Sequence, residues 1–371
     1  MKIGINATHL NEEPTGIGVV TREVARNLYR LHRNVLTFTS LPGNSLAAGP
    51  VFRVPASTRG SKKLKNNLLR AVYLNTVLPL QARRSRIDVL YCPILEFPRF
   101  PLSPLVVTVH DLQPLAYPSQ FGLSVHYFRY CLNRLSRVAA RVTVVSGFVR
   151  KELLAATDLR EELIDVIPNG YDAALFRPQD PALRDAFLSK YSLGGRYILY
   201  VGTLFPYKNV GLLADAFLGI ADRLDHRLVI VGRRSPGDEI LPRSDRIRYM
   251  DYVAHGDLPK FYAYADMLVH PSLSEGFGLT PLEAMACGTP VLASCRASLP
   301  EVVGDAGILF DPTDAGELGS LILKVASDKS LRAGMRERGL KRAGDFSWEK
   351  MAAGILESCR KAARGKASKA A

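Results

Sequence analysis

The sequence predicts an α/β protein of two domains, each built on a parallel β-sheet with helices on its faces. Two observations predict this class. Short apolar runs typical of buried strands alternate with helical segments along the whole chain, and this order produces parallel sheets. The chain has 371 residues, which is too many for one ordinary hydrophobic core and suits two domains of common size.

In the first half, a buried strand is expected at the start of the chain, followed by a glycine-containing loop. The apolar run at residues 2–6 predicts the strand, and Thr15-Gly16-Ile17-Gly18 is expected to lead into a helix at residues 19–31. Later runs predict strands at residues 105–109, 142–145 and 164–167, with a short helix at residues 150–156. The turn Pro168-Asn169-Gly170 and the irregular stretch 177–181 indicate a linker between the domains.

The second half repeats this alternation. Its apolar runs predict strands at residues 197–201, 228–231, 247–252, 267–269, 291–293 and 308–310. Helices are expected at residues 210–221 and 258–264, the second capped by Asp257. A last amphipathic helix is expected at residues 349–363, followed by a disordered tail of Lys, Gly, Ser and Ala.

The composition predicts a soluble globular protein in a reducing compartment. With 47% hydrophobic and 23% charged residues, the chain is not of the disordered class. Its five cysteines are odd in number, widely spaced and set among apolar neighbours, which favours free thiols over disulfides or a zinc site. No signal peptide is expected before the first strand, and no apolar run approaches the ~20 residues that span a bilayer.

The net charge of +14 lies in the first part of the chain. Residues 1–150 contain 20 Lys and Arg against 6 Asp and Glu, and the remaining residues balance at 29 of each. The basic residues around the apolar stretch Leu68–Leu80 are Arg59, Lys62, Lys63, Lys65, Arg70, Arg83, Arg84 and Arg86. They form either a solvated face or a surface that docks a cytoplasmic protein on the anionic inner face of the cell membrane. Nucleic acid is not expected as a partner, because no binding motif or interleaved aromatic residues accompany the charges.

The segment Ser274–Pro290, with the sequence SEGFGLTPLEAMACGTP, is the most informative stretch. It follows an apolar strand-like run and places two carboxylates, Glu275 and Glu283, on either side of a glycine-rich bend that opens a helix. Gly276 and Gly278 let the backbone approach a ligand closely. The bend therefore predicts a ligand site at the carboxyl end of a strand.

The helix after this bend has both start and stop signals. Thr280 is expected as its N-cap and Pro281 at its first position, with Cys287-Gly288 at its end. The backbone N–H groups expected to be free for a bound phosphate are those of Gly278, Leu279 and Thr280. Glu283 has a second explanation, because with Thr280 it fits a capping box, whereas Glu275 has no such structural role.

Together with five further motifs, this segment resembles a known family. It is similar to the Glu-x7-Glu signature of the retaining, nucleotide-sugar-dependent glycosyltransferases of family 4. The other motifs, in the family's order, are Thr15-Gly16-Ile17-Gly18, Val107-Thr108-Val109-His110-Asp111-Leu112, Ile167-Pro168-Asn169-Gly170-Tyr171-Asp172, Tyr200-Val201-Gly202-Thr203 with Pro206 and Lys208-Asn209, and Leu299-Pro300-Glu301-Val302. The resemblance spans nearly the whole chain and is greatest to bacterial mannosyltransferases that build surface polysaccharides.

The resemblance implies the GT-B fold, in which two Rossmann-like domains carry parallel sheets that face a central cleft. Residues 1–172, with a last helix from about 354 to 371, would form the acceptor-binding domain, and residues 173–353 the donor-binding domain. The implied reaction transfers a hexose with retention and without an essential metal, and the chain has no Asp-x-Asp motif. The implied substrates are a nucleotide sugar, GDP-mannose, and a glycan or lipid-linked acceptor.

Several residues at strand ends receive roles from this resemblance. Glu275 would hold donor-sugar hydroxyls and stabilise positive charge at the anomeric carbon, while Glu283 would accept hydrogen bonds from the ribose. His110 would position the sugar or the acceptor, and Lys208 would stabilise the departing diphosphate. The donor-binding residues expected are Gly16, Gly18, Thr203, Lys208, Glu275, Gly276, Phe277, Gly278, Leu279, Thr280 and Glu283. Two facing strand edges would bring His110, Lys208 and Glu275 into one cleft.

The chain departs from the family at the diphosphate. Where the family usually has an Arg, this chain has Thr203, and its loop carries Phe205 and Tyr207. Two arginines after the next strand, Arg233 and Arg234, are alternative cations. Glu301 is expected either near the donor or in a cap or salt bridge, and His110 has the alternative of a satisfied structural histidine.

Other classes of protein remain as alternatives. The loop Thr15-Gly16-Ile17-Gly18 suggests a nicotinamide oxidoreductase, but position 21 is Thr, so the Gly-x-Gly-x-x-Gly fingerprint is incomplete. A GT-B epimerase or hydrolase of nucleotide sugars is the nearer alternative. A basic scaffold without enzymatic activity would not need Glu275, Lys208 and the glycines together.

Overall fold

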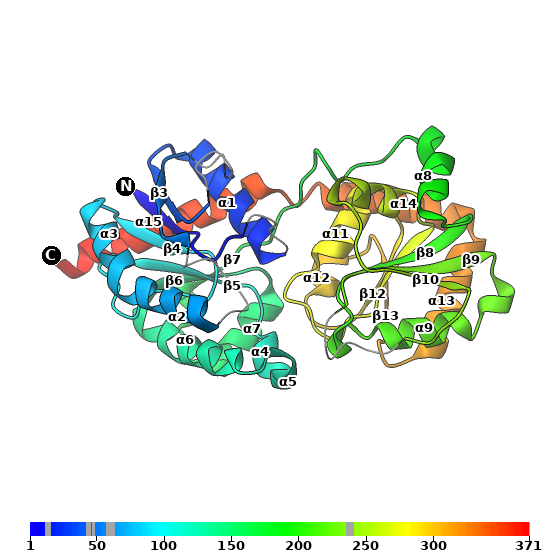
Figure 1. Ribbon diagram of the computed structural model, residues 1–371, viewed down its shortest axis with the longest axis horizontal. Coiled ribbons are helices and arrows are strands. Elements are labelled where there is room, and N and C mark those ends of the chain that lie inside the picture. Colours follow the sequence, from blue (N-terminus) through cyan, green and yellow to red (C-terminus); the bar gives the residue numbers. More distant parts are fainter. Residues whose placement is uncertain (12–15, 42–45, 47–48, 57–63, 235–240, 371) are drawn as a thin grey trace. The chain divides into compact units, whose positions relative to one another are not determined.

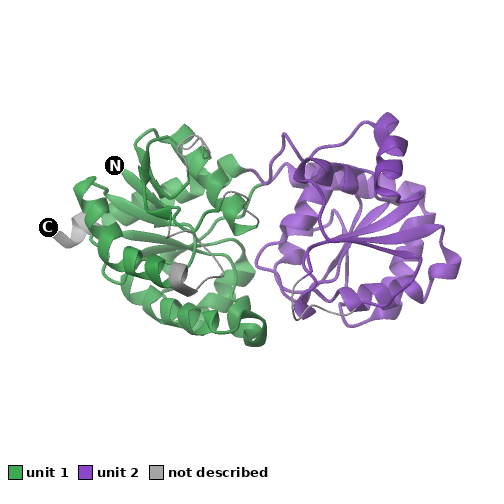
Figure 2. Ribbon diagram, viewed as in Figure 1, with its two compact units in different colours: residues 1–170, 348–371 green, residues 171–347 purple. Residues whose placement is uncertain are grey.

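The computed structural model contains two parallel β-sheets, one in each of two units, as the sequence predicted (Figure 1, Figure 2). Unit 1 comprises residues 1–170 and 348–371, and unit 2 comprises residues 171–347. The structure describes residues 1–11, 16–41, 46, 49–56, 64–234 and 241–370, and it leaves out the side chains of residues 64–67 and 366–370. The residues Thr15, Arg59, Lys62 and Lys63, and the side chain of Lys65, lie outside this description.

The sheet of unit 1 has seven parallel strands in the order β3-β2-β1-β4-β5-β6-β7. They are β1 (Ile3–Asn6), β2 (Val35–Thr39), β3 (Val51–Arg53), β4 (Val89–Cys92), β5 (Leu105–Val109), β6 (Ala139–Val144) and β7 (Ile164–Val166). The strand order reverses between β1 and β4. In an open α/β sheet, this reversal is where a crevice for ligands forms at the carboxyl ends of the strands.

The helices of unit 1 cover both faces of this sheet (Figure 1). They are α1 (Ile17–Leu31), α2 (Leu64–Val72), the π-helix η3 (Tyr73–Val77), α3 (Leu78–Arg84), α4 (Gln113–Ala116), α5 (Pro118–Phe121), α6 (Ser124–Val138), α7 (Gly147–Ala156), the 3-10 turn η4 (Glu161–Leu163) and α15 (Trp348–Ala370). The expected loop at Gly16 and Gly18 is shorter than predicted. Gly16, with φ +47°, is the N-cap of α1, so Gly18 lies inside the helix.

The C-terminal helix α15 belongs to unit 1 from its first residue. It packs against α1 and against strands β4, β5 and β6. A Cβ added to Gly354 would lie 2.9 Å from Ile167, so glycine allows the helix to approach the end of β7 closely. The return to unit 1 therefore comes at Trp348, before the predicted position near residue 354. The tail predicted to be disordered is instead helical through Ala370.

The sheet of unit 2 has six parallel strands in the order β10-β9-β8-β11-β12-β13. They are β8 (Arg196–Val201), β9 (His226–Val231), β10 (Ile247–Met250), β11 (Met267–His270), β12 (Val291–Ser294) and β13 (Ile308–Phe310). Each begins and ends within two residues of the predicted strand. Here the order reverses between β8 and β11. Their buried aliphatic side chains form a core with the flanking helices.

The helical segments of unit 2 include one whose predicted cap is wrong. They are η5 (Pro181–Leu183), α8 (Arg184–Tyr191), η6 (Pro206–Lys208), α9 (Val210–Leu218), η7 (Ala221–Arg223), η8 (His255–Asp257), α10 (Leu258–Ala263), α11 (Leu279–Ala286), α12 (Leu299–Val303), α13 (Ala315–Ser327) and α14 (Lys329–Ala343). Asp257 makes no side-chain cap to α10. Its carboxylate instead accepts hydrogen bonds from Lys190 (2.6 Å) and Tyr191 (2.7 Å), so it ties α8 to the start of α10.

The strand ends of β8 and β9 approach each other so closely that one position requires glycine. A Cβ on Gly232 would lie 1.7 Å from the carbonyl oxygen of Gly202, a backbone atom that cannot move aside. The N–H of Gly202 bonds to the carbonyl of Val231, so this contact continues the sheet into the loops beyond it.

Replacing Gly232 by alanine should destabilise unit 2 by about 2 kcal/mol, because the added methyl group forces these two loops apart. For a unit of this size, the expected loss is about 4–8 °C in Tm, measured by differential scanning fluorimetry. Gly256→Ala is the matched control, since its Cβ would meet nothing within 4 Å. Equal melting of both variants would show that the loops tolerate the methyl group.

Candidate active site

The reversal point of unit 2 brings together two of the predicted site residues. Lys208 ends the short turn η6 that follows β8, and Glu275 lies in the bend that follows β11. Because β8 and β11 are neighbouring parallel strands, both segments leave the sheet at the carboxyl ends of its strands. The sequence predicted one cleft for His110, Lys208 and Glu275. The structure brings Lys208 and Glu275 together, and the meeting with His110 of unit 1 stays a prediction.

Lys208 and Glu275 form a partly buried ion pair with a third member, His270. The Lys208 Nζ is 2.7 Å from Glu275 Oε1, and the His270 Nε2 is 2.6 Å from the same oxygen. The side chains of Glu275 and Lys208 are 12% and 15% exposed, and that of His270 is 3% exposed. Glu275 is thus held at one oxygen by two nitrogen groups.

The surroundings of Glu275 favour its charged form. Burial alone would raise the pKa of the Glu275 carboxyl group, but the nearby Lys208 charge and the hydrogen bonds from His270 and Lys208 hold it well below its ordinary value. The carboxylate is therefore ionised at neutral pH. A fixed negative charge at a ligand-binding edge can stabilise positive charge that develops in a transition state.

The bend itself is stabilised by its glycine and by a serine from the next loop. Gly278 has φ +110° and serves as the N-cap of α11, and Leu279 begins the helix. The hydroxyl of Ser298 lies 2.9 Å from the carbonyl oxygen of Glu275 and 2.8 Å from that of Phe277. These contacts hold the backbone on both sides of Gly276, and Ser298 was not found by sequence analysis.

The predicted N-cap of this helix is wrong. Thr280 lies inside α11, and no side chain caps the helix, so the capping box proposed as an alternative for Glu283 is not formed. The reason is the left-handed conformation of Gly278, which starts the helix two residues early. The predicted end is confirmed, because α11 stops at Ala286 and Cys287 is its C-cap.

Glu283 lies one turn into α11 and has a different environment from Glu275. Its Oε2 accepts a hydrogen bond from the hydroxyl of Tyr262 at 3.0 Å. Burial raises the pKa of Glu283 to about 8, although the Tyr262 hydrogen bond opposes this rise. The surroundings therefore favour the ionised form of Glu275 and the protonated form of Glu283.

The loop that lacks the family's arginine is filled by aromatic side chains. Phe205 and Tyr207 stack at 5.7 Å, and the Nζ of Lys208 lies 5.2 Å from the centre of the Tyr207 ring. The carbonyl of Thr203 accepts a hydrogen bond from Tyr200. The exposed Arg233 and Arg234, after β9, lie over the rings of Tyr252 and Tyr249. Glu301 is an exposed residue in the first turn of α12, close in sequence to Ser298.

In unit 1, His110 directly follows β5. Its Nε2 is 2.8 Å from the carbonyl oxygen of Pro93, and burial lowers the pKa of His110 to about 4 despite this hydrogen bond. A carbonyl only accepts, so Nε2 carries the proton and Nδ1 keeps its lone pair. The neutral ring therefore has one nitrogen fixed by structure and one able to accept a hydrogen bond.

Three further residues gather near His110 at the reversal point of unit 1. Arg70, from α2, pairs with Glu96 at 2.8 Å, and both side chains are less than one-fifth exposed. His9, after β1, bonds to Thr21, and burial together with the nearby Arg70 and His110 lowers the pKa of His9 to about 3. Sequence analysis did not identify His9 or Glu96 as site residues. Strand β4, which pairs with β1 and precedes Glu96, was not predicted. Arg70 was noted only as part of a basic surface.

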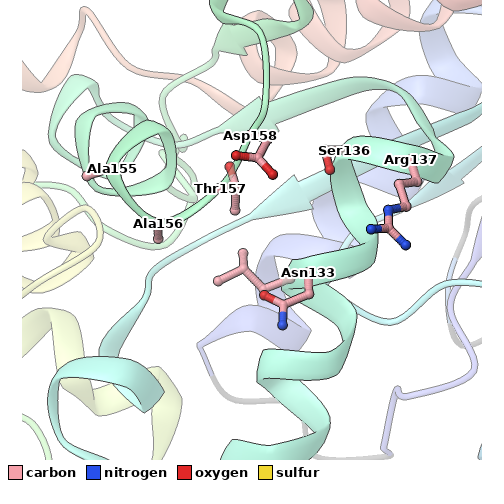
Figure 3. Close-up of a pocket in the computed structure, with 8 residues that line it drawn as sticks. Asn133, Ser136, Arg137, Ala155, Ala156, Thr157 and Asp158 are labelled. Carbon is pink, nitrogen blue, oxygen red and sulfur yellow. The ribbon is translucent and has the colours of Figure 1, made fainter.

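A pocket between α6 and α7 lies near the starting ends of strands β6 and β7 (Figure 3). Its volume is about 420 Å³. Its lining residues are Leu132, Asn133, Ser136, Arg137, Ala155, Ala156, Thr157 and Asp158. Both helices end here, next to the starting ends of β6 and β7, so the pocket is separate from the strand ends that carry His9 and His110.

The structure places the predicted catalytic and donor-binding residues in both units. Gly16, Gly18 and His110 lie in unit 1, and all the others lie in unit 2. Among the described residues, no group of three His, Cys, Asp or Glu side chains is arranged to hold a metal ion. None of the helices in the described part of the chain has the length and apolar character needed to cross a membrane.

Comparison with known proteins identifies related domains in both units. A family model described as Glycosyltransferase Family 4 matches residues 14–175, and one described as Glycosyl transferases group 1 matches residues 188–342. An O-antigen chain mannosyltransferase B of Escherichia coli is 37% identical over 67% of this chain and 68% of its own length. A D-inositol 3-phosphate glycosyltransferase of Segniliparus rotundus is 36% identical over 62% of this chain and 53% of its own length.

A solved structure shares the fold over nearly the whole chain. The crystal structure of Anabaena HepE in complex with UDP and glucose matches with a TM-score of 0.75 and 20% identity, covering 96% of this chain and 99% of that protein. This likeness identifies the fold as GT-B, as predicted. The two family models and both curated relatives described above are glycosyltransferases, and they give no support to the alternative of a nucleotide-sugar epimerase or hydrolase.

The raised pKa of Glu283 predicts a stability that depends on pH. The folded protein holds this proton more tightly than the unfolded chain, so the contribution is complete at acidic pH and is lost as the pH rises toward about 8. Glu283→Gln cannot ionise. Its Tm should change less than that of the parent between about pH 5.5 and pH 8.5, and at the upper pH it should melt at a higher temperature.

The exposed Glu337 provides the control for this measurement. Glu337→Gln removes a carboxylate on α14 that is open to solvent, so its pH dependence should follow the parent. Parallel curves for Glu283→Gln and the parent would show that Glu283 titrates as an ordinary carboxyl group.

Proposed function

The chain belongs to the glycosyltransferases that join a family 4 domain to a group 1 domain, and we propose that it transfers mannose from GDP-mannose to a saccharide acceptor with retention of configuration. The observation that carries this proposal is the ionised Glu275 beside Lys208 at the reversal point of unit 2. A negative and a positive group at one strand edge suit the two charges that separate when a sugar leaves a diphosphate.

Lys208 and the start of α11 supply the positive charge for the diphosphate in this proposal. Lys208 extends from a short turn, and its ammonium group is a mobile point charge on a flexible stem. The first N–H groups of α11, including those of Leu279 and Thr280, have no partner within the helix and favour an anion. These groups stabilise the leaving nucleoside diphosphate, which supports a reaction without an essential metal ion.

Glu275 acts on the transferred sugar. Its Oε1 is occupied by Lys208 and His270, and the described residues make no hydrogen bond to its Oε2. That oxygen is available for the sugar hydroxyls and faces the positive charge that develops at the anomeric carbon. Glu283, further along α11, accepts hydrogen bonds from the ribose hydroxyls, and the donor is held in unit 2.

The acceptor binds at the reversal point of unit 1. His110 presents an unprotonated Nδ1, which can accept a hydrogen bond from a sugar hydroxyl. The neighbouring Arg70–Glu96 pair and His9 offer donors and acceptors in fixed positions. A planar guanidinium beside a carboxylate is well suited to the paired hydroxyl groups of a saccharide. Unit 1 is thus the acceptor domain of the proposed enzyme.

The choice of donor follows the relatives. The Escherichia coli relative is named as an O-antigen chain mannosyltransferase, and this chain matches 68% of the length of that relative. We extend its sugar to this protein and expect GDP-mannose as the donor and a growing glycan, free or lipid-linked, as the acceptor. Because this choice rests on the name of a relative, the donor requires its own test.

The transfer reaction and the role of Glu275 are tested together. With GDP-mannose and a mannose-terminated oligosaccharide, the protein should form a lengthened product whose new linkage keeps the donor's configuration, as shown by NMR. Glu275→Gln should lower kcat by about 100-fold or more, since it removes charge from the transition state, while the Kd for GDP changes less than about threefold. Turnover in EDTA should be unchanged.

Two comparisons make this test specific. Glu337→Gln, on the exposed face of α14, should retain parental activity. UDP-glucose and UDP-galactose are tried in the same assay. Transfer from one of them but not from GDP-mannose would reject the donor, whereas transfer from none of the three would reject the reaction. Saturating turnover by Glu275→Gln equal to that of the parent would remove this carboxylate from the mechanism, and an inverted linkage would reject retention.

We also propose that unit 1 docks on an anionic membrane surface, where a lipid-linked acceptor would lie. The helical segment formed by α2, η3 and α3 exposes large apolar side chains, including Leu68 (65%), Val72 (52%) and Leu80 (53%). The exposed Arg83 and Arg84 end α3. Apolar side chains and cations on one segment add their separate weak attractions to anionic lipid.

Charge reversal at the end of α3 tests this docking. The variant Arg83→Glu, Arg84→Glu, Arg86→Glu should co-sediment less with vesicles containing anionic lipid, because each cation near the surface contributes ~1 kcal/mol of attraction. High salt should release the parent protein, because salt screens this attraction. The control reverses three exposed cations of unit 2, Lys324, Lys329 and Lys341. Equal binding of both variants, or equal binding to neutral vesicles, would identify the basic surface as a solvated face.

A further inference from the structure

His270 is a buried residue next to the reacting groups for which the sequence suggested no role. The predicted strand stopped at Val269, but β11 includes His270 as its last residue. The side chain is only 3% exposed. The strand and its neighbours therefore fix where the imidazole lies, one residue before the loop that carries Glu275.

Both polar contacts of the His270 ring are made by its Nε2. Its Nε2 lies 2.6 Å from Glu275 Oε1 and 3.2 Å from the hydroxyl of Ser272. The ring stacks on Tyr200 from β8, with centres 6.2 Å apart and planes inclined by 14°. Its Nδ1 is buried and has no hydrogen-bond partner among the described residues. Since a carboxylate only accepts, Nε2 carries a proton and donates it to Glu275.

Lys208 contacts the same oxygen but is held quite differently. It ends a three-residue turn, and its ammonium group is carried on four methylene groups with several rotatable bonds. Its side chain is five times more exposed than that of His270, at 15% against 3%. The proposed function also gives Lys208 a second partner, the diphosphate. Of the two donors to Glu275, one is rigid and one can change partners.

We propose that His270 is the positioning residue of the catalytic carboxylate: it holds Oε1 of Glu275 in place when Lys208 turns to the diphosphate. Oε2 then keeps its direction toward the donor sugar throughout the exchange. This inference rests on the proposed function, because it assumes that Glu275 acts on the sugar and Lys208 on the diphosphate. Ser272 and the Tyr200 ring fix the imidazole in turn.

The physical need for such a residue comes from the burial of Glu275. A carboxylate that is 12% exposed and loses its cation must retain another donor, or it rotates to find one or takes up a proton. Both outcomes would remove the charge from the sugar. Around His270, the titratable groups from the packed elements are Glu275 in the bend, Lys208 from η6 and Tyr200 from β8.

The same sheet contains a matched control. His226, the first residue of β9, donates to Asp266 Oδ2 at 2.7 Å and is 2% exposed, and its Nδ1 is likewise buried without a partner among the described residues. This pair lies at the starting ends of the strands, the edge opposite Glu275. Replacing His226 therefore causes the same kind of structural loss without touching the reacting groups.

The experiment compares His270→Leu, His270→Gln and His226→Leu in the full-length protein. His270→Leu should reduce kcat by about 100-fold and leave the donor KM and the GDP Kd within about threefold of the parent. His270→Gln, whose amide nitrogen can replace Nε2, should recover most of this loss. His226→Leu should lower Tm and leave kcat of the folded protein unchanged. Lys208→Ala, by contrast, should weaken GDP binding.

A pH profile separates positioning from general damage. Loss of the His270 hydrogen bond raises the pKa of Glu275, so the acidic limb of kcat should move to higher pH in His270→Leu and remain in place in His270→Gln and His226→Leu. If His270→Leu does not fold, His270→Asn replaces it, because the shorter amide cannot reach Oε1, and it should behave as His270→Leu does.

The outcomes also distinguish this inference from the function on which it rests. A parental kcat and pH profile in His270→Leu or His270→Asn, together with an inactive Glu275→Gln, would overturn the positioning role alone. Parental activity of Glu275→Gln would overturn the proposed function as well. Equal loss of kcat in His226→Leu and His270→Leu would show that the effect is one of stability.

Discussion

The desolvated carboxylate of Glu275 is the constraint on which the site in unit 2 depends. A buried negative charge must be matched by nearby donors, and here both come from strands that neighbour each other in space but lie far apart in sequence. His270 belongs to β11 itself, while Lys208 follows β8, some 60 residues earlier in the chain. The ion pair can therefore form only after the parallel sheet has set these strands side by side. The electrostatics of the site are thus a product of the fold, and the fold provides them at the edge where ligands bind.

The backbone around this charge is held by contacts that side-chain chemistry alone would not indicate. Gly232 is pressed against the carbonyl of Gly202, so the loops after β8 and β9 have little freedom. Gly278 turns the chain into α11 with a positive φ, and Ser298 binds the carbonyls of Glu275 and Phe277. The result is a constrained bend with a long lysine side chain beside it. In our proposal, the bend fixes the carboxylate and the flexible lysine exchanges partners.

Local sequence was sufficient where burial decides the structure and insufficient where distant partners decide it. The apolar runs at residues 105–109 and 308–310 are β5 and β13 with their predicted bounds, because a buried strand needs little beyond its own composition. The cap at Asp257 failed because Lys190 and Tyr191 compete for its carboxylate. In unit 1, the side chain of Asn6 in β1 donates a hydrogen bond to the carbonyl oxygen of Glu96 because β4 pairs with β1, and no local sequence pattern predicts that pairing.

Two histidine–carboxylate pairs of unit 2 differ mainly in their position in the sheet. At the starting ends of the strands, Asp266 Oδ2 accepts hydrogen bonds from His226 and Arg196, much as Glu275 Oε1 accepts them from His270 and Lys208. The local chemistry is nearly the same at both edges. Only the Glu275 pair, however, has a glycine bend and a helix N-terminus beside it, because in parallel sheets those features follow the carboxyl ends of strands. The Asp266 pair joins β8, β9 and β11 at their beginnings, whereas the same kind of pair at the opposite edge lies beside the helix N-terminus where we propose that the diphosphate binds.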